Sequence, residues 1–323
     1  SLLSDGPGHV LKDSTFRIMD PLSQKMMALR SDVTAQISRI ASTRLLHLPR
    51  PLRLSYSGDV LRVKGDNFNM ERQKTQVGAE LIGPKSELID SEIILVCCQS
   101  LKSINIKNIT VDLNLPFLRE RLLNSINKPL KEKINEAIDR KDLQTLTKLK
   151  FDNSETILKL MESAGNYEHG IKYLSELKLD GKLSEVREYL LKVINIIKEN
   201  DNSINISIDP LENRGFKYHT GLTFTIFSEI FKGEIVKGGS YKTLSGETAT
   251  GCTIYTEKIY SQTITQENND LVYIPYLNIF EADSLIQKGF KVVFGSTLTN
   301  DFDKEAIQLK CQYIWKNKTI VKL

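Results

Sequence analysis

The apolar residues of the first third of the chain change between helical and strand spacing. Two short apolar stretches, Phe16–Met19 and Met26–Leu29, flank a turn-forming Asp-Pro pair, and this arrangement predicts a hairpin. From about Thr34 the apolar residues recur at helical spacing, and Ser31 or Asp32 stands just before them, where a side chain can cap free N–H groups. The predicted buried stripe of this helix is Ile37, Ile40, Ala41 and Leu45.

Two long strands are predicted next, over Leu52–Arg62 and Arg72–Ile82, with a polar loop around Gly65 between them. Gly83-Pro84 ends the second strand. A further helix follows, and its buried face carries Leu88, Ile93, Val96, Cys97 and Leu101.

From about Phe117 to Asn200 the chain is rich in Lys, Glu, Leu and Ile at helical spacing, which predicts a helical insertion. One of its apolar stripes consists of Leu190, Val193, Ile194 and Ile197. Strands are predicted again over Ile204–Ile208, Leu222–Phe231 and Thr248–Tyr255. From about Asn268 a small α/β pattern follows, with strands over Leu271–Tyr276, Lys291–Gly295 and Gln312–Trp315 and helices over Glu281–Lys288 and Asp303–Leu309.

These elements predict an α+β fold in which a mainly antiparallel sheet is flanked by helices. The core is expected in two parts, residues 1–116 and 201–265, separated by the helical insert of residues 117–200. Residues 266–323 are expected to form a separate small C-terminal α/β unit.

Composition narrows the class of protein. Of 323 residues, 40% are hydrophobic and 26% are charged, which is typical of a globular chain. The net charge of +4 is too small to indicate a dedicated nucleic-acid binder, and no apolar run approaches the ~20 residues that a membrane-spanning helix needs. The four cysteines form no CxxC pair, so neither a zinc site nor a disulfide framework is predicted, and a cytoplasmic location is expected.

The strand over Arg72–Ile82 has the most informative pattern of polar residues. Side chains alternate across a strand, so one face carries Arg72, Lys74, Gln76, Gly78, Glu80 and Ile82. The other face, from Gln73 to Leu81, is expected to pack under helices. The polar face can hold a zwitterion, with Glu80 facing an ammonium and Arg72 or Arg62 facing an anion. An ordinary solvent-exposed sheet face is an equally good interpretation.

A second polar cluster spans Arg214–Gly221 and combines two glycines with the aromatic residues Phe216 and Tyr218. It is consistent with a loop that lines a ligand site, or with a hairpin in which Tyr218 covers the core. His219 has no nucleophile pattern beside it, so it does not indicate catalysis. For Gly238-Gly239-Ser240 a hairpin turn is favoured over a phosphate-binding turn.

Taken in order, these segments resemble the catalytic core of class II histidyl-tRNA synthetases, and more closely their paralogue, the regulatory subunit of ATP phosphoribosyltransferase. Residues 29–36, LRSDVTAQ, resemble LRPEGTA in the synthetases and LRPDMTPQ in the paralogue. Residues 72–83, RQKTQVGAELIG, are similar to motif 2 of the family, in the form that is typical of the regulatory subunit. Residues 214–221, RGFKYHTG, resemble RGLDYY in the synthetases and RGFxYYTG in the regulatory subunit.

The chain departs from the synthetase pattern where ATP would be bound. Residues 238–242, GGSYK, resemble the synthetase GGRYD with its Arg and Asp lost, and residues 251–259, GCTIYTEKI, resemble motif 3 with Lys258 in place of an Arg. Lysine lacks the planar, two-pronged donor set of arginine, so the exchange is not conservative at a nucleotide clamp. The resemblance therefore predicts an amino-acid pocket that is retained and an adenylating site that is damaged.

The resemblance implies a class II synthetase-like fold and a non-catalytic regulatory subunit. Such a subunit assembles with the short-form catalytic subunit of ATP phosphoribosyltransferase, usually as a hetero-octamer, in the first step of histidine biosynthesis. It is required for activity and mediates feedback inhibition by histidine. No cofactor, metal or catalytic residue is implied. The first motif of the family is expected upstream of Ser1, so we expect the sequence to be truncated at its N-terminus.

By the same resemblance, Asp32 and Glu80 face the ammonium of histidine and Thr34 adds a hydroxyl group. The remaining predicted histidine-binding residues are Arg62 and Arg72 for the carboxylate or a nearby anion, Gln76 as a polar partner, Tyr218 and His219 beside the imidazole, and Arg214 in a binding role. A divergent histidyl-tRNA synthetase is the alternative function. A nucleic-acid-binding module is a third, and the small net charge counts against it.

Overall fold

The computed structural model describes residues 11–65, 70–176, 181–212, 218–263, 270–275, 278–295 and 301–323. The chain divides into two compact units, residues 1–259 and 260–323. The predicted boundary at residue 266 lies outside the described residues. Among the helices of the described part, none combines the length and the apolar character needed to span a membrane.

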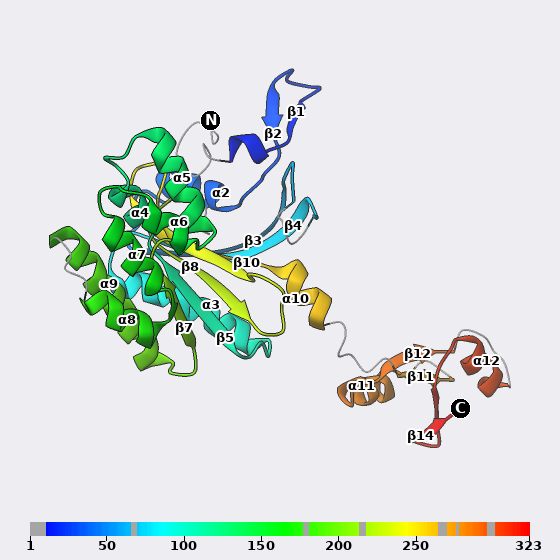
Figure 1. Cartoon of the computed structure of the whole chain (residues 1–323). Coiled ribbons are helices and arrows are strands. Elements are labelled where there is room, and N and C mark those ends of the chain that lie inside the picture. The colour runs from blue at the N-terminus through cyan, green and yellow to red at the C-terminus, as the bar shows by residue number, and fades with distance from the viewer. Residues whose placement is uncertain are drawn as a thin grey trace. The chain divides into compact units, whose positions relative to one another are not determined.

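An eight-stranded sheet forms the centre of the large unit (Figure 1). Its strands, in spatial order, are β3 (Leu52–Leu61), β4 (Gln73–Ile82), β10 (Thr248–Tyr255), β9 (Val236–Lys242), β8 (His219–Ser228), β5 (Ile109–Asn114), β7 (Asn205–Asp209) and β6 (Gly165–Asn166). Only β5 and β7 are parallel, and every other neighbouring pair is antiparallel. The predicted α+β fold with a mainly antiparallel sheet is therefore confirmed.

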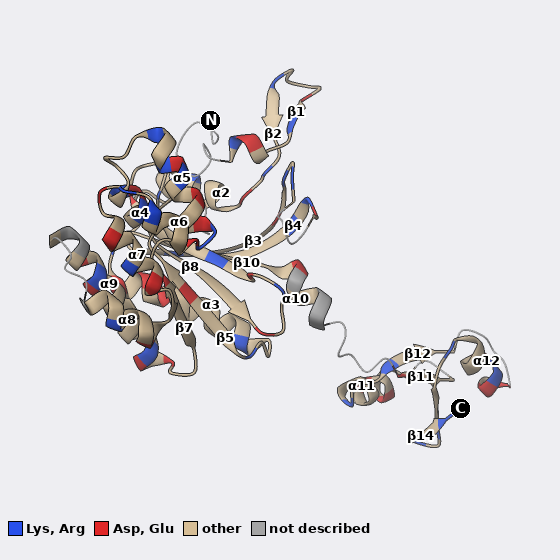
Figure 2. Cartoon of the chain, viewed as in Figure 1, with Lys and Arg blue, Asp and Glu red and all other residues tan. Residues whose placement is uncertain are grey.

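Helices cover both faces of this sheet. The helices that follow one another in the large unit are α2 (Thr34–Thr43), α3 (Glu87–Ser103), α4 (Pro116–Leu122), α5 (Lys128–Asp139), α6 (Leu143–Lys148), α7 (Ser154–Glu162), α8 (Tyr167–Glu176), α9 (Gly181–Asn200) and α10 (Thr256–Thr263), after a short 3-10 turn at Lys12–Ser14. Ser86 caps α3 by accepting the N–H of Ile89. Basic and acidic residues are interspersed over the helices between β5 and β7 (Figure 2).

Two hydrophobic cores lie on opposite faces of the sheet. One core joins α3 and α9 to the sheet through Leu81, Cys252 and Phe224, and it includes the helices of residues 117–200. Its members include Ile93, Cys97 and Leu101 of the predicted buried face and the predicted stripe Leu190, Val193, Ile194 and Ile197. Leu88 and Val96, which were predicted on the same buried face, are instead exposed. The second core packs α2 against residues such as Ile82 and Tyr241, whose side chains lie on the other face. The helical segment therefore shares one continuous core with the sheet.

The face of β4 that the structure buries differs from our expectation. The alternation along β4 is confirmed, but the polar face is the buried one: Lys74, Gln76 and Glu80 are at most 4% exposed, whereas Val77 on the other face is 37% exposed. The interpretation of this polar face as solvent-exposed is therefore wrong. Burying these polar groups requires partners within the fold, because an unpaired buried polar group is costly.

The segment Gly238-Gly239-Ser240 lies inside β9 and does not form the predicted hairpin turn. β9 pairs with β8 on one side and β10 on the other, so its hydrogen bonds are those of a central strand. A Cβ atom on Gly238 would lie 2.2 Å from the ring of Phe224, so glycine is needed for close packing there. Pairing with neighbours thus overrides the low strand propensity of glycine.

The N-terminal hairpin and the first helix follow the predictions. β1 (Arg17–Met19) pairs with β2 (Met26–Ala28) as a two-stranded antiparallel sheet. Helix α2 begins at Thr34, and Asp32 Oδ1 accepts the N–H of Thr34 at 2.9 Å. Asp32 thereby satisfies one of the free N–H groups at the start of the helix.

The small unit is a four-stranded sheet with two helices. Its strands, in spatial order, are β12 (Lys291–Phe294), β11 (Leu271–Ile274), β13 (Tyr313–Lys316) and β14 (Thr319–Lys322), and its helices are α11 (Ile279–Gln287) and α12 (Phe302–Gln308). β11 is parallel to β12 and β13, as expected for an α/β unit, and the antiparallel edge strand β14 was not predicted. Its hydrophobic residues form two clusters, one around Leu285 and Trp315 and one around Tyr273.

We predict that the two units unfold separately. Trp315, the only tryptophan of the chain, is buried in the small unit and donates its Nε1–H to Glu281 at 2.8 Å. Its fluorescence should therefore report the small unit, whereas far-ultraviolet circular dichroism is dominated by the large unit. Urea denaturation followed by both signals should give two midpoints. Trp315→Phe should remove the fluorescence transition alone; coincident transitions in the unsubstituted chain would show one cooperative unit.

Candidate functional site

A hollow in the sheet surface lies where glycines stand in register on neighbouring strands. Glu80 of β4 is opposite Gly251 of β10, and Gly251 is opposite Gly239 of β9. A Cβ atom on Gly251 would lie 1.8 Å from Glu80 Oε2, and one on Gly239 would lie 2.8 Å from the carbonyl oxygen of Leu222. Gly251 therefore makes room for the carboxyl group of Glu80, whereas Gly239 allows the close approach of β8.

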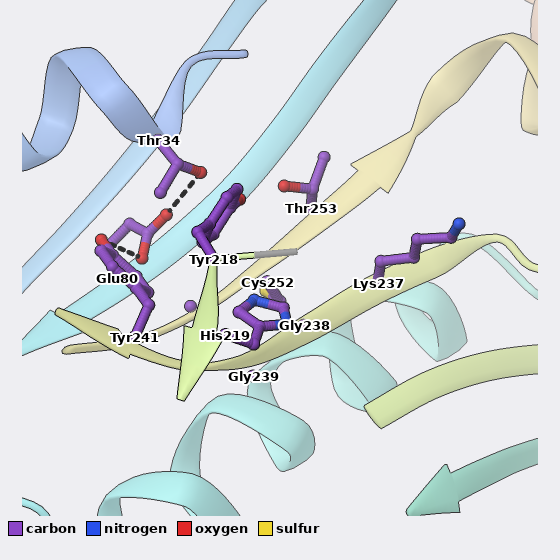
Figure 3. A pocket seen from close by; sticks show the side chains of 11 residues that line it. Thr34, Glu80, Tyr218, His219, Lys237, Gly238, Gly239, Tyr241, Cys252 and Thr253 are labelled. Atoms are coloured by element: carbon purple, nitrogen blue, oxygen red, sulfur yellow. Dashed lines mark hydrogen bonds between the residues drawn. The ribbon is translucent and has the colours of Figure 1, made fainter. Parts of the chain in front are cut away.

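A small cavity opens at this hollow, and together with the solvent at its mouth it encloses about 170 Å³ of empty space. Figure 3 shows Thr34 and Tyr241 gathered around Glu80 at one end, while Lys237 extends away from them. The lining residues are Thr34, Glu80, Tyr218, His219, Lys237, Gly238, Gly239, Tyr241, Gly251, Cys252 and Thr253.

Glu80 is the acidic group of the cavity. Its Oε1 accepts the hydroxyl of Thr34 at 3.1 Å, and its Oε2 accepts the hydroxyl of Tyr241 at 3.0 Å. Burial raises the pKa of Glu80 to about 8, against the lowering effect of these two hydrogen bonds. A carboxyl group with this pKa is mostly protonated at pH 7 and becomes a carboxylate when a cation approaches it.

Asp32 and Arg62 form a buried pair beside the cavity lining. Asp32 Oδ2 lies 3.6 Å from Arg62 Nη2, and the Arg62 guanidinium also donates to the carbonyl oxygen of Ser31 and the hydroxyl of Tyr255, both at 3.2 Å. Burial raises the pKa of Asp32, while the charge of Arg62 and the N–H of Thr34 oppose that shift. The pair holds the start of α2 against the sheet.

Tyr218 and His219 form the aromatic wall of the cavity. Their rings meet edge to face with centroids 5.0 Å apart, and the ring of Tyr218 meets that of Tyr241 in the same way at 5.8 Å. Burial, with a smaller contribution from the charge of Lys237, lowers the pKa of His219 to about 3. His219 is therefore neutral at pH 7, which suits a binding role better than proton transfer at that pH.

The other predicted site residues that the structure describes do not line the cavity. Gln76 is fully buried, and its Oε1 accepts the N–H of Val33 at 3.0 Å, so it ties β4 to α2 without lining the cavity. Arg72 is exposed, and its guanidinium lies 5.7 Å from the centroid of the Phe16 ring, away from the cavity lining. Arg214 and the side chain of Lys258 lie outside the described parts of the chain.

The structure thus brings Thr34, Glu80, Tyr218 and His219 together and leaves Arg72 outside, although Arg72, Gln76 and Glu80 were expected to share a cavity. The physical reason is that β4 begins at Gln73, so Arg72 precedes the strand and does not follow its alternation. Arg62, which is 9% exposed, is the buried arginine next to the cavity.

Sequence reasoning missed several lining residues, of which Tyr241 and Lys237 have functional side chains. Both lie on β9, and they line the cavity because β9 is a central strand between β8 and β10. The available signal was the GGSYK segment, whose Tyr241 follows the two glycines and was not assigned a role.

The arrangement favours binding of a small polar molecule. It offers one ionisable carboxyl group, the hydroxyls of Thr34 and Tyr241 and a neutral imidazole within one small cavity. No cluster of His, Cys, Asp and Glu that could hold a metal ion occurs among the described residues. The chemistry fits an amine or a zwitterion, with Glu80 as the partner of the cation.

Comparison with known proteins identifies the family. The family model described as histidyl-tRNA synthetase matches residues 1–259. A protein of Rhodospirillum centenum that is named ATP phosphoribosyltransferase regulatory subunit is 35% identical, and the match covers 97% of this chain and 82% of that protein. A protein of the same name from Paramagnetospirillum magneticum is 39% identical over 80% of this chain and 68% of its own length.

Solved structures show the same fold. A Bacillus halodurans structure described as an ATP phosphoribosyltransferase regulatory subunit/histidyl-tRNA synthetase has a TM-score of 0.73 at 20% identity and covers 93% of this chain and 83% of its own. Histidyl-tRNA synthetase from Nostoc sp. PCC 7120 has a TM-score of 0.69 at 16% identity and covers 95% and 80%. The fold is therefore that of a class II aminoacyl-tRNA synthetase-like protein.

Within that class, the chain belongs to the histidyl-tRNA synthetase family, in its ATP phosphoribosyltransferase regulatory subunit branch.

Glu80 should make the stability of the chain depend on pH. Its pKa is about 8 in the folded chain and about 4.5 for an ordinary glutamate, so the folded chain keeps a proton that the unfolded chain has released between these two pH values. The free energy of unfolding should therefore fall as the pH rises through this range, with a contribution from Glu80 on the order of 5 kcal/mol. Glu80→Gln should remove that contribution, as measured by urea denaturation at a series of pH values.

Glu92→Gln is the matched control, because it makes the same chemical change in a half-exposed carboxylate that pairs with Arg53. The Glu92 variant should keep the contribution of Glu80 to the pH dependence of the free energy of unfolding. Equal pH dependence in both variants would show that Glu80 is ionised normally.

Proposed function

We propose that this chain is a non-catalytic regulatory subunit of ATP phosphoribosyltransferase, which acts in the glycosyl transfer that opens histidine biosynthesis. It is required by a short-form catalytic subunit and transmits feedback inhibition by histidine. The complex is a cytoplasmic hetero-octamer. The observation that carries the proposal is the polar cavity around Glu80 in a chain whose curated relatives are named as this regulatory subunit.

The partner in this proposal is suggested by a structural relative. A structure from Thermotoga maritima described as an ATP phosphoribosyl transferase (HisG:HisZ) complex contains a chain of the same fold, with a TM-score of 0.59 at 21% identity, covering 75% of this chain and 88% of that one. That description supports a catalytic ATP phosphoribosyltransferase subunit as the partner of this chain.

Histidine is the proposed ligand of the cavity. Its ammonium would lie beside Glu80, with Asp32 adding negative charge nearby, and its side chain would meet the aromatic wall of Tyr218 and His219. Arg62, which is held in its pair with Asp32, is the cation that we assign to the carboxylate. Histidine regulates the complex if it binds one arrangement of the subunits more tightly than the other, because a ligand shifts an equilibrium only by its difference in affinity.

The contacts of Ser240 support binding of histidine without its activation. Ser240 stands where the resembling synthetase segment has an arginine, and its hydroxyl donates to Asp90 on the face of the sheet away from the cavity. Ser240 therefore supplies no cation to a nucleotide, whereas an adenylating enzyme uses such groups to stabilise developing charge. Lys258 adds a second such departure in sequence.

We predict that histidine binds the isolated chain and that Glu80→Gln weakens binding at least tenfold, because the amide cannot neutralise an ammonium. Isothermal calorimetry measures both affinities. In buffers of different ionisation enthalpy, binding at pH 7 should also release close to one proton per site, since the ligand cation converts the protonated Glu80 into a carboxylate. Glu92→Gln should bind like the unsubstituted chain; equal affinity in the Glu80 variant would remove Glu80 from the histidine site.

We predict that the full-length protein co-purifies with a short-form catalytic subunit and is needed for its activity. Histidine should inhibit the complex, and Glu80→Gln should leave activation intact while it raises the histidine concentration needed for inhibition by tenfold or more. Robust ATP- and histidine-dependent pyrophosphate exchange by the chain alone would favour a divergent synthetase instead. Steeply salt-dependent RNA binding without effect on the transferase would favour a nucleic-acid module.

A further inference from the structure

A second buried carboxyl group lies behind the cavity, on the opposite face of the sheet. Asp90 of α3 is 1% exposed. Its Oδ1 accepts the hydroxyls of Thr250 at 2.6 Å and Ser240 at 3.2 Å, and its Oδ2 accepts the hydroxyl of Tyr189 at 2.7 Å. One carboxyl group therefore connects β9, β10 and α9 to α3.

The two strand residues that Asp90 holds are direct neighbours of the cavity lining. Ser240 and Thr250 are partners in the register of β9 and β10, and their side chains lie on the α3 face. The next residues along each strand face the other way, and these are Gly239, Tyr241 and Gly251 of the cavity. The carboxyl group thus contacts the reverse side of the part of the sheet that surrounds Glu80.

We propose that Asp90 is a positioning residue for the cavity: it joins β9 to β10 from the reverse face, so that Gly239 and Gly251 stay opposite each other and Tyr241 keeps its contact with Glu80. This inference rests on the proposed function for its ligand, histidine, and Asp90 itself makes no contact with the cavity.

The cavity does not tolerate a change in the register of β9 and β10. A slip of one residue in a strand exchanges its two faces. It would place a side chain where Gly251 now stands, although a Cβ atom there would lie only 1.8 Å from Glu80 Oε2. Two hydroxyl groups that must point at one buried acceptor oppose such a slip, because a displaced hydroxyl would leave a polar group unpaired in the core.

The buried carboxyl group of Asp90 is not explained by a gain in stability. Burial raises the pKa of Asp90, while the hydrogen bonds from Thr250 and Tyr189 and the charge of Lys85 oppose the shift. Well-packed apolar residues would avoid that cost of burial and often stabilise a core more than a polar group does. Apolar contacts are not directional, whereas hydrogen bonds are. The alignment of β9 and β10 requires directional contacts.

The test uses Thr250→Val, which removes one hydroxyl at nearly constant volume. We expect histidine affinity to fall at least tenfold in calorimetry, although the substituted side chain faces away from the cavity. Asp90→Ala should have a larger effect. Asp90→Asn should restore most of the affinity, because an amide oxygen still accepts both strand hydroxyls.

Ser91→Ala is the matched control for a general loss of stability. Ser91 neighbours Asp90 on α3, is fully buried, and donates to the carbonyl oxygen of Val193 on α9 at 3.4 Å without bonding a sheet strand. Its histidine affinity should stay within twofold of the unsubstituted chain, after urea denaturation has measured the stability of every variant. Equal affinities in the Thr250 and Ser91 variants would overturn the positioning role.

A ligand-free measurement separates this inference from the proposed function. Carboxyl ¹³C NMR titration follows the pKa of Glu80, which is raised by burial in the intact cavity. Thr250→Val should move that pKa toward the ordinary value by letting the cavity loosen, and Ser91→Ala should not. If the unsubstituted chain binds no histidine but this shift occurs, the proposed function fails and the positioning role of Asp90 stands; an unchanged pKa in the Thr250 variant would overturn that role.

Discussion

The burial of the Glu80 carboxyl group is the constraint on which the site depends. A carboxyl group inside a fold needs space and hydrogen-bond donors. The space comes from Gly251, whose missing side chain would otherwise overlap the carboxyl group, and the donors come from Thr34 and Tyr241. Four elements, α2, β4, β9 and β10, must therefore meet at one point before the cavity exists.

The sheet meets this requirement by using its two faces differently. On one face the central strands carry glycine, tyrosine and the carboxyl group of the cavity, and α2 covers the apolar remainder. On the other face the same strands pack against α3 and α9. Because side chains alternate along a strand, those of β9 and β10 point in turn to the cavity face and to the core behind it, and Gly238 and Cys252 of the core face also border the cavity. This division is why Ser240, placed between two cavity residues, contacts Asp90 in the core.

The regions predicted best from sequence were those with a strong local signal. The strands β3 and β4 have regular periodicity and clear end signals, and their predicted bounds lie close to the observed ones. Helix α2 begins at the predicted Thr34. Four of the predicted site residues, Thr34, Glu80, Tyr218 and His219, line the cavity because the family motifs place them there. β9 has no such local signal: its two glycines suggested a turn, and only pairing on both sides makes it a strand.

The alternation along β4, the family of the chain and the residue types available for a polar pocket could all be read from the amino-acid sequence. Tertiary structure decided which face of β4 is buried, that Arg62 stands beside the cavity while Arg72 lies outside, and that Tyr241 completes the partners of Glu80. The physical reason is that periodicity shows which side chains share a face, whereas the element that covers a face comes from elsewhere in the chain.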